Sequence, residues 1–333
     1  MVFAKDKYSS NAMGGTEIMK YALAEKLDAS LLDKFQIFIS RVHEELSEDH
    51  YRILWLQDLA DDPENDHLKN NGWKKFHKLV FASNWQMRGF IEKFKIPWSM
   101  CVVIHNSINP IEAVEKPTDK INLIYHTTPH RGLEILYPVF DKLSKEHDNI
   151  HLDVYSSFNL YGWGDRDKPY QKLFDSLNAH EHISYHGAVS NEEVRKALQS
   201  AHIFTYPSIW SETSCLCLME AMSAGLHCVH PNYGALPETA SVWTFMYQMQ
   251  DTHQQHAEML YSILNGLITD LKNPENEKTY SNRVKAQKAY IDTFYNRDFW
   301  AVNWKNMLEN IAAIAPDKTL NKSSGQMFSY KVG

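Results

Sequence analysis

The sequence predicts an α/β protein with two parallel, doubly wound sheets, and two observations predict this class. Short apolar runs alternate with segments of helical period along most of the chain, an order that builds parallel sheets joined by crossover helices. The chain has 333 residues, of which 44% are apolar and 23% charged. This is the composition of an ordinary globular protein, and the length suits two domains of about 100–200 residues each.

The pattern is clearest in the second half of the chain. The short apolar runs expected to form strands there are residues 121–125, 151–155, 182–186, 202–206 and 227–230. Helical segments lie between them. Because a parallel connection needs about a dozen residues and turns right-handed, these strands are expected to pair in parallel in one doubly wound sheet.

The first part of the chain repeats the pattern less regularly. Strands are expected over residues 35–40, 51–56, 78–82 and 101–104, and helices near 16–27 and 84–94. Only twelve residues precede the segment MGGTE (13–17), where a sheet of this kind needs a full strand. Either the first sheet lacks its opening strand, or the start of the gene is misplaced.

These elements divide the chain into four parts. Residues 109–120 are expected to be the interdomain linker, because Pro110 and Pro117 interrupt a charged, weakly apolar segment there. We therefore expect a first domain over residues 1–116 and a second domain over 117–295. The pattern after about residue 255 is helical, and an aromatic-rich helix over 296–314 is expected to pack back on the first domain. Residues 315–333 form a polar tail that is expected to fray from Pro316.

Composition argues against several kinds of function. The formal charge of −7 comes without a cluster of Lys and Arg, which argues against binding to nucleic acid. The four cysteines have no CxxC spacing and no secretory segment precedes them, so we expect reduced thiols and a cytoplasmic protein. No apolar run approaches the ~20 residues of a transmembrane helix, although peripheral contact with a membrane would leave no such trace. The 17 histidines are scattered singly, so no metal site is expected.

The most informative segment is YPSIWSETSCLCLMEAMSAGLHCVH (206–230). It reads as strand, loop, helix and strand, with Ser214 as the expected N-cap of the helix and Gly225 as the residue that ends it. The loop over 211–214 then carries backbone amides and the positive helix end to the carboxyl edge of the sheet. Anionic ligands bind at that edge in such folds, and a diphosphate would fit.

Glu212 and Glu220 flank this helix start. Eight positions of helix would separate them by roughly 12 Å, whereas glycosidases hold their two carboxylates at most about 9.5 Å apart. The spacing suits an elongated ligand with a sugar at one end, a diphosphate in the middle and a ribose at the other. The spacing alone is equally compatible with the alternative that Glu212 is a solvated loop residue and Glu220 a charge on the helix surface.

The two glutamates, followed by AMSAG (221–225) and GALPET (234–239), resemble the signature of glycosyltransferase family 4, retaining enzymes of the GT-B fold among the glycosyl transferases group 1. MGGTE (13–17), FASNWQ…VVIHNSIN (81–109) and TPHRGLEIL (128–136) resemble further motifs of that family in the expected order. The resemblance covers most of the chain. It implies a GT-B-like fold, with two Rossmann-like doubly wound domains facing a cleft. The first would lie on the acceptor side and the second would bind the nucleotide-sugar donor.

The resemblance also implies roles for individual residues. Glu220 would accept hydrogen bonds from the donor ribose, and Glu212 with the amides of Thr213 to Cys215 would hold the transferred sugar. Arg131 would neutralise the leaving β-phosphate, because a fixed guanidinium and helix-start amides can replace a metal ion. We therefore expect Glu212 and Arg131 to be catalytic, and the donor to be bound by Gly14, Gly15, His126, Val189, Thr213, Ser214, Cys215, Leu216 and Glu220.

Two of these assignments have a structural alternative or a weaker basis. Gly14 and Gly15 precede a helix and could form a second anion-binding turn, or they could simply permit a tight turn. Val189 lies just before a capping box formed by Ser190 and Glu193, in a loop that sits beside the nucleobase in the family.

The sequence departs from the family pattern in two places. Relatives carry two cations at the donor phosphates, but here only Arg131 is evident, and His126, Thr127 or Thr128 occupies the place of the other. Where many relatives have a His–Asp pair beside the sugar, this chain has Gln57–Asp58.

The function expected is metal-independent, retaining transfer of a hexose from a nucleotide-sugar donor to a glycan, lipid-linked or protein-linked acceptor, without a cofactor. Two alternatives stay open: a nucleotide-sugar-binding protein with little turnover, and a nucleotide-sugar epimerase. A dehydrogenase ranks lower because no GxGxxG follows a strand. The sequence does not specify the base, the sugar or the acceptor, which depend on a few pocket contacts.

Overall fold

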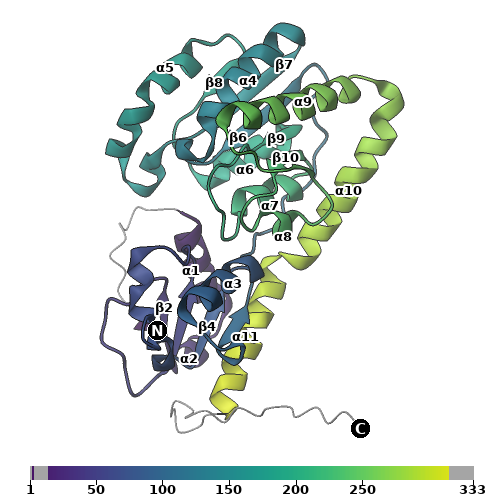
Figure 1. The fold of residues 1–333 in the computed structure, drawn as a ribbon. Helices are drawn as coiled ribbons and strands as arrows, with labels where there is room; N and C mark the ends of the chain where they lie inside the picture. The colour runs from purple at the N-terminus through teal and green to yellow at the C-terminus, as the bar shows by residue number, and fades with distance from the viewer. Residues whose placement is uncertain (1, 4–13, 315–333) are drawn as a thin grey trace, which may run out of the picture. The chain divides into compact units, whose positions relative to one another are not determined.

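The structure, a computed structural model, describes residues 2–3 and 14–314 (Figure 1). Within these residues the chain forms two compact units. The first comprises residues 2–3, 21–105 and 301–314, and the second comprises 14–20 and 106–300. The predicted tail from Pro316 lies outside the described residues.

The first unit is built on a parallel sheet. Its strands are β1 (Val2–Phe3), β2 (Phe35–Ile39), β3 (Tyr51–Leu56), β4 (Lys78–Phe81) and β5 (Cys101–Val103). All the strands predicted in the first part of the chain form, and β1 pairs in parallel with β2. The first sheet therefore has a strand before helix α1 (Gly15–Lys26), a point that the sequence did not decide.

The strand order of this sheet is β1-β2-β3-β4-β5. It follows the chain without the reversal that defines double winding, which differs from the expectation for the first domain. Strands β2 and β3 pair directly over five positions, from Phe35 with Tyr51 to Ile39 with Trp55. This pairing leaves only the outer edge of β2 for β1.

The first unit contains the part of helix α1 (Gly15–Lys26) that follows residue 20, together with α2 (Ala29–Leu32) and α3 (Asn84–Phe94). The bounds of α1 and α3 agree with the predicted helices. Helix α3 begins where the side chain of Ser83 accepts a hydrogen bond from the amide of Gln86.

The end of helix α11 (Arg297–Ile314) groups with the first unit. Trp304 is fully buried and its ring lies 4.8 Å from the ring of Trp55 on β3. The hydroxyl of Tyr51 donates to the carbonyl of Ala312. Aromatic pairs of this kind stabilise by about 0.5–1.5 kcal/mol beyond their buried area.

The second unit is built on a larger parallel sheet with the strand order β11-β10-β9-β6-β7-β8. Its strands are β6 (Ile121–His126), β7 (Ile150–Tyr155), β8 (Ile183–Tyr185), β9 (Ile203–Thr205), β10 (His227–Pro231) and β11 (Phe245–Tyr247). The first five were predicted and β11 was not. The order reverses at β6, whose two neighbours are β7 and β9, so this sheet is doubly wound as predicted.

The helices of the second unit are α4 (Leu133–Glu146), α5 (Gln171–Ala179), α6 (Asn191–Ser200), α7 (Leu216–Ser223), α8 (Leu236–Ala240), α9 (His253–Leu271) and α10 (Glu277–Phe294). Helix α4 packs against α9, and α10 packs against α7 (Figure 1). The strands carry the core, in which Leu123, Tyr125 and Phe204 are fully buried. Within residues 2–3 and 14–314, no helix combines the length and apolarity needed to cross a bilayer.

Candidate functional site

The site lies at the point where the strand order of the second sheet reverses. Strands β6 and β9 are neighbours, and the chain leaves their carboxyl ends in opposite directions. Such a reversal opens a crevice at the carboxyl edge of a parallel sheet, where ligands bind. The two loops that enter this crevice are residues 127–132 after β6 and 206–215 after β9.

A glycine allows the two loops to approach closely. Gly132 has a φ of +116°, and a Cβ atom built on it would lie 2.0 Å from the carbonyl oxygen of Pro207. Any other residue would have to push the two loops apart. Gly132 directly follows Arg131, so this contact fixes the position of the arginine.

Arg131 and Glu212 form a buried ion pair across the crevice. Nη1 of Arg131 donates to Oε1 of Glu212 at 2.6 Å, and the side chains are 20% and 6% exposed. The hydroxyl of Tyr206 donates to the same oxygen. The structure thus brings together the two residues that the sequence predicted to be catalytic, although the resemblance had assigned Arg131 to a phosphate rather than to Glu212.

Burial raises the pKa of Glu212, while Arg131 and Tyr206 oppose the rise. Because both hydrogen bonds end on Oε1, the atom Oε2 has no partner within the described residues. The carboxylate is therefore held in one orientation and still has an oxygen available to a ligand.

Helix α7 begins one residue later than predicted. Its N-cap is Cys215, whose backbone is extended and whose sulfur accepts from the amide of Leu218. Ser214 is therefore not the cap, because the chain becomes helical only from Leu216. The hydroxyl of Ser214 is buried and has no hydrogen-bond partner in the described part of the chain.

Helix α7 ends as predicted. Gly225 has a φ of +73°, and its amide donates to Met222 while the amide of Leu226 donates to Ala221. These are the two bonds of a Schellman motif. The helix therefore spans two turns and carries Glu220 in its second turn.

Glu220 is held in the same way as Glu212. Nη1 of Arg195 donates to Oε1 of Glu220 at 3.0 Å, and Nδ2 of Asn191 contacts the same oxygen at 3.4 Å. Within the described residues Oε2 again has no partner. Burial raises the pKa of Glu220, and His126 and Arg195 oppose the rise. Neither Arg195 nor Asn191 was predicted, because both lie on helix α6, far from α7 in the sequence.

His126 ends strand β6 and is 6% exposed. The sulfur of Cys217 donates to its carbonyl oxygen at 3.1 Å. Burial alone would lower the pKa of His126, but Cys217 and Glu220 beside it outweigh this and raise the pKa. The Nε2 atom of His126 is buried and has no hydrogen-bond partner in the described part of the chain.

A second glycine positions Glu212 from the other side. A Cβ atom on Gly234 would lie 2.6 Å from the amide nitrogen of Glu212, and the carbonyl of Glu212 accepts from the amide of Ala235 at 2.7 Å. This contact explains why a glycine opens the segment GALPET. It also ties that segment to the crevice.

Several buried side-chain atoms around the crevice have no hydrogen-bond partner in the described part of the chain. They follow or end strands β6, β7 and β9: His126 Nε2, Thr128 Oγ1, Arg131 Nε, Ser156 Oγ, Thr205 Oγ1 and Ser214 Oγ. Buried polar atoms are normally paired. Their concentration at one sheet edge fits a site for a polar, anionic ligand.

Three further predicted site residues are Gly14, Gly15 and Val189. Gly14 and Gly15 lie in the segment that groups with the second unit, where a Cβ atom built on Gly14 would lie 2.2 Å from the ring of Tyr161 and one on Gly15 would lie 3.2 Å from Leu216. Val189 precedes helix α6, whose capping box of Ser190 and Glu193 forms as predicted.

Gln57 and Asp58 lie in the first unit, after strand β3. The carboxylate of Asp58 lies 3.8 Å from Nε of Arg41. Burial raises the pKa of Asp58, and Arg41 opposes the rise. Asp58 is thus a partly buried carboxyl group at the carboxyl edge of the first sheet.

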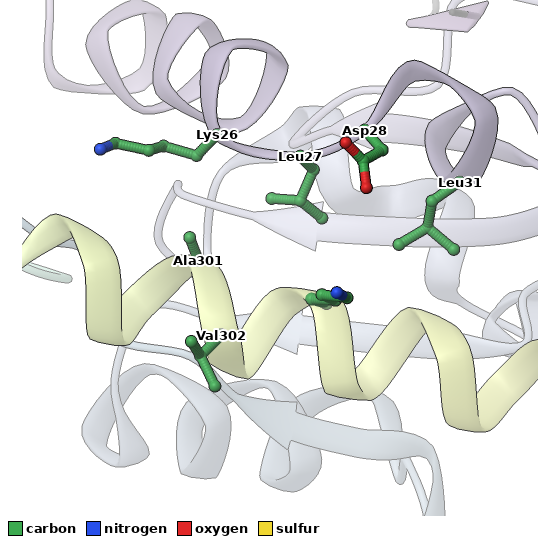
Figure 2. Close-up of a pocket in the computed structure, with 7 residues that line it drawn as sticks. Lys26, Leu27, Asp28, Leu31, Ala301 and Val302 are labelled. Carbon is green, nitrogen blue, oxygen red and sulfur yellow. The ribbon is translucent and has the colours of Figure 1, made fainter.

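A pocket in the first unit is not a candidate for this chemistry. It has a volume of about 160 Å³ and lies between the turn joining α1 to α2 and the helix α11 (Figure 2). Leu27, Leu31, Ala301 and Val302 supply much of its lining, and it contains none of the predicted site residues. Within residues 2–3 and 14–314, no three His, Cys, Asp or Glu side chains gather as metal ligands.

A family model described as "Glycosyl transferases group 1" matches residues 108–279, which are 172 of the 333 residues. The phosphatidylinositol N-acetylglucosaminyltransferase gpi3 subunit of Schizosaccharomyces pombe is 23% identical over 164 residues, 49% of this chain and 33% of that protein. A human phosphatidylinositol N-acetylglucosaminyltransferase subunit is 24% identical over 141 residues, 41% of this chain and 28% of that protein. The match thus spans a third or less of the length of each relative.

Solved structures share the fold at low identity. A glycosyltransferase from Rickettsia africae aligns with a TM-score of 0.66 at 14% identity, covering 92% of this chain and 84% of that one. The Anabaena protein HepE, in complex with UDP-glucose, aligns with a TM-score of 0.66 at 13% identity, covering 93% and 99%. These alignments confirm the predicted GT-B-like α/β fold.

Proposed function

Because the chain belongs to the glycosyl transferases group 1 family, we propose that it transfers a hexose from a nucleoside-diphosphate sugar to a hydroxyl acceptor. The transfer retains the configuration of the sugar and needs no metal ion. The acceptor is a glycan, or a lipid-linked or protein-linked hydroxyl group. Assignment to family 4 within the group remains part of this proposal.

One observation carries the proposal. Glu212 and Glu220 are both buried, both held by an arginine through Oε1, and both left with Oε2 for a ligand. The first turn of helix α7 lies between them in the chain, as does the hydroxyl of Ser214, which has no hydrogen-bond partner within the described residues. A nucleotide sugar has the matching order, with a hexose and a ribose on either side of a diphosphate.

Each part of the donor then has a partner. Oε2 of Glu220 accepts from the ribose hydroxyls, and Oε2 of Glu212 accepts from a hydroxyl of the transferred sugar. The diphosphate rests on the amides over residues 213–215, where the helix dipole favours negative charge. The loop that contains Val189 lies beside the base.

Arg131 and His126 stabilise the leaving group. Arg131 uses Nη1 for Glu212, and its buried Nε has no partner within the described residues, so a phosphate oxygen can bind there. Nε2 of His126 is available in the same way. Charge grows on the β-phosphate as the glycosidic bond breaks, and fixed donors in a buried site are most effective against such charge.

In the transfer step the acceptor oxygen attacks the anomeric carbon from the face that the nucleotide leaves. The bond from the anomeric carbon to the β-phosphate oxygen breaks, and its electrons remain on the phosphate. The acceptor proton passes to that phosphate oxygen. This route requires no covalent enzyme intermediate.

We also propose a cytoplasmic location for this part of the chain. The four cysteines are unpaired thiols, and Cys215 and Cys228 are buried. Unpaired thiols are typical of a reducing compartment. Fractionation that recovered the protein from an oxidising compartment would contradict this assignment.

The proposed activity is tested by incubating the protein with nucleotide sugars in a chelator. UDP-glucose and UDP-N-acetylglucosamine are the first donors to try, because HepE was solved with UDP-glucose and the curated relatives are named for N-acetylglucosamine transfer. Product that forms only when an acceptor is added supports transfer. Conversion of the donor alone would indicate an epimerase, and binding without turnover under every acceptor would indicate a binding protein.

A Glu220→Ala variant tests the binding site itself. A hydrogen bond to a charged group contributes about 1.5–3 kcal/mol, so loss of one such bond weakens nucleotide binding about tenfold or more. Calorimetry that found unchanged affinity would reject the ribose role of Glu220.

A further inference from the structure

We propose that Arg195 is a positioning residue that fixes Glu220 for the donor ribose and joins that contact to the start of the interdomain linker. The inference rests on the proposed function, because it takes Glu220 as the ribose-binding carboxylate. It adds a second arginine to a site in which the sequence showed only Arg131.

The hydrogen bonds of Arg195 show this double role. Nη1 donates to Oε1 of Glu220 at 3.0 Å. Nη2 donates to the carbonyl oxygens of Asn109 at 2.8 Å and Pro110 at 3.2 Å. One planar guanidinium therefore binds a site carboxylate and two linker carbonyls at once.

Burial makes the contact with Glu220 consequential. The side chains of Arg195 and Glu220 are 24% and 10% exposed. Burial raises the pKa of Glu220, and Arg195 is one of the two cations that oppose the rise. Arg195 therefore orients the carboxylate and favours its ionised form, which accepts hydrogen bonds from ribose hydroxyls.

The linker itself lies along the second unit through several further bonds. The amide of Ile111 donates to Ser223 at 2.8 Å, Gln199 donates to the carbonyl of Glu112 at 3.1 Å, and Lys116 donates to the carbonyl of Ala201 at 2.5 Å. None of these partners belongs to the proposed site. Arg195 differs from them because it also holds a residue of that site.

The consequence is that the ribose contact and the linker share one guanidinium. A change in linker path that removed the carbonyls of Asn109 and Pro110 would leave Arg195 free to turn away from Glu220. Conversely, a nucleotide bound to Glu220 favours the arrangement in which Arg195 binds both Glu220 and the linker carbonyls. Since any such coupling is reciprocal, donor binding is expected to stabilise this linker path.

The test compares a nucleoside diphosphate with its 2′,3′-dideoxy counterpart by calorimetry, using whichever of the uridine, adenosine and guanosine diphosphates the wild type binds most tightly. The wild type is expected to prefer the ribonucleotide by about tenfold or more. The R195Q variant is expected to lose most of this preference and to keep its affinity for the dideoxy compound.

Two further variants separate positioning from a general effect. K196Q is the matched control on the same helix, because it removes an exposed cation that pairs with Glu192. Its preference for the ribonucleotide is expected to equal that of the wild type. E220Q is expected to lose the preference as R195Q does. The double variant R195Q/E220Q is expected to lose no more than either, because residues acting through one contact are not additive.

Hydrogen exchange tests the linker half of the proposal, with E220Q as the control because it keeps the linker bonds of Arg195. Amides over residues 106–116 are expected to exchange faster in R195Q than in the wild type, K196Q and E220Q. Equal exchange in all four proteins would overturn the connection to the linker.

The outcomes distinguish this inference from the proposed function. If the wild type prefers the ribonucleotide and R195Q keeps that preference, or loses affinity equally for both compounds, the positioning role is wrong and the proposed function stands. If the wild type binds nucleotides without a ribose preference, the roles of Glu220 and Arg195 both fail. If it binds no nucleoside diphosphate, the proposed function fails and this inference with it.

Discussion

Replacement of Arg131 by methionine tests the buried ion pair at the centre of the site. Arg131 and Glu212 are joined at 2.6 Å and are mostly buried. Removal of one partner of a buried ion pair costs about 3–5 kcal/mol, because the remaining charge is left without compensation. Since a fifth of the Arg131 side chain is exposed, we expect the lower end of this range, about 3 kcal/mol.

This loss is large enough to measure by thermal unfolding. For a domain of about 150–250 residues, each kcal/mol changes the melting temperature by about 2–4 °C. R131M is therefore expected to lower the melting temperature of the second unit by about 6–12 °C. Urea unfolding at constant temperature checks the free energy independently.

The loss is also expected to depend on pH. Burial raises the folded-state pKa of Glu212 above its unfolded value, and Arg131 opposes the rise. The stability that such a carboxyl group contributes is fully present below its unfolded pKa and is lost as pH rises through its folded pKa. Without Arg131 the folded pKa is higher still, so R131M is expected to be destabilised more at about pH 7.5 than at about pH 5.

The double variant R131M/E212Q is the control, because it removes both charges from the same place. It is expected to recover much of the stability and to show no such pH difference. A loss below about 1 kcal/mol in R131M, the value of an exposed pair, would show that the ion pair is not buried in solution. An equal loss at both pH values would show that Glu212 is not left charged and uncompensated.

Three further predictions test other parts of the site. Gly225→Ala is expected to cost about 1–2 kcal/mol of stability because Gly225 has a left-handed backbone, but transfer is expected to be unaffected, since nothing lies within 4 Å of the added Cβ. In Gly234→Ala the added Cβ collides with the backbone of Glu212, so both transfer and stability are expected to fall. Equal transfer activity in the two variants would contradict this prediction. A chelator is expected to leave the transfer rate unchanged, and a rate restored only by added Mg²⁺ or Mn²⁺ would show that a metal takes part. A nucleoside diphosphate at 100 times its Kd is expected to stabilise the folded chain by about 2.7 kcal/mol, which raises the melting temperature in the absence of metal. If no nucleoside diphosphate raised the melting temperature, this would argue against donor binding.

The sequence predicted most of the second unit because its strands are short apolar runs separated by helical segments. Strand β11 was missed because it has only three residues, and an apolar run this short does not distinguish a strand from a loop or a helix segment. In the first unit the strands were predicted but their order was not. Strand order depends on which edges pair, and local patterns carry no information about that.

The site was predicted in part for similar reasons. Glu212 and Glu220 could be found because their spacing lies within one segment. The N-cap was misplaced because Ser214 has the usual chemistry of a cap, whereas Cys215 supplies it with a sulfur atom. Arg195 was missed because it reaches Glu220 from another helix, and a single sequence does not show which helix faces meet.

A crystal structure of the protein with a bound nucleotide sugar would test the proposed site most directly. We predict the diphosphate on the backbone amides at the start of helix α7, the ribose against Oε2 of Glu220 and the hexose against Oε2 of Glu212. A donor bound away from the carboxyl edge between β6 and β9, or a helix start covered by neighbouring side chains, would contradict this prediction.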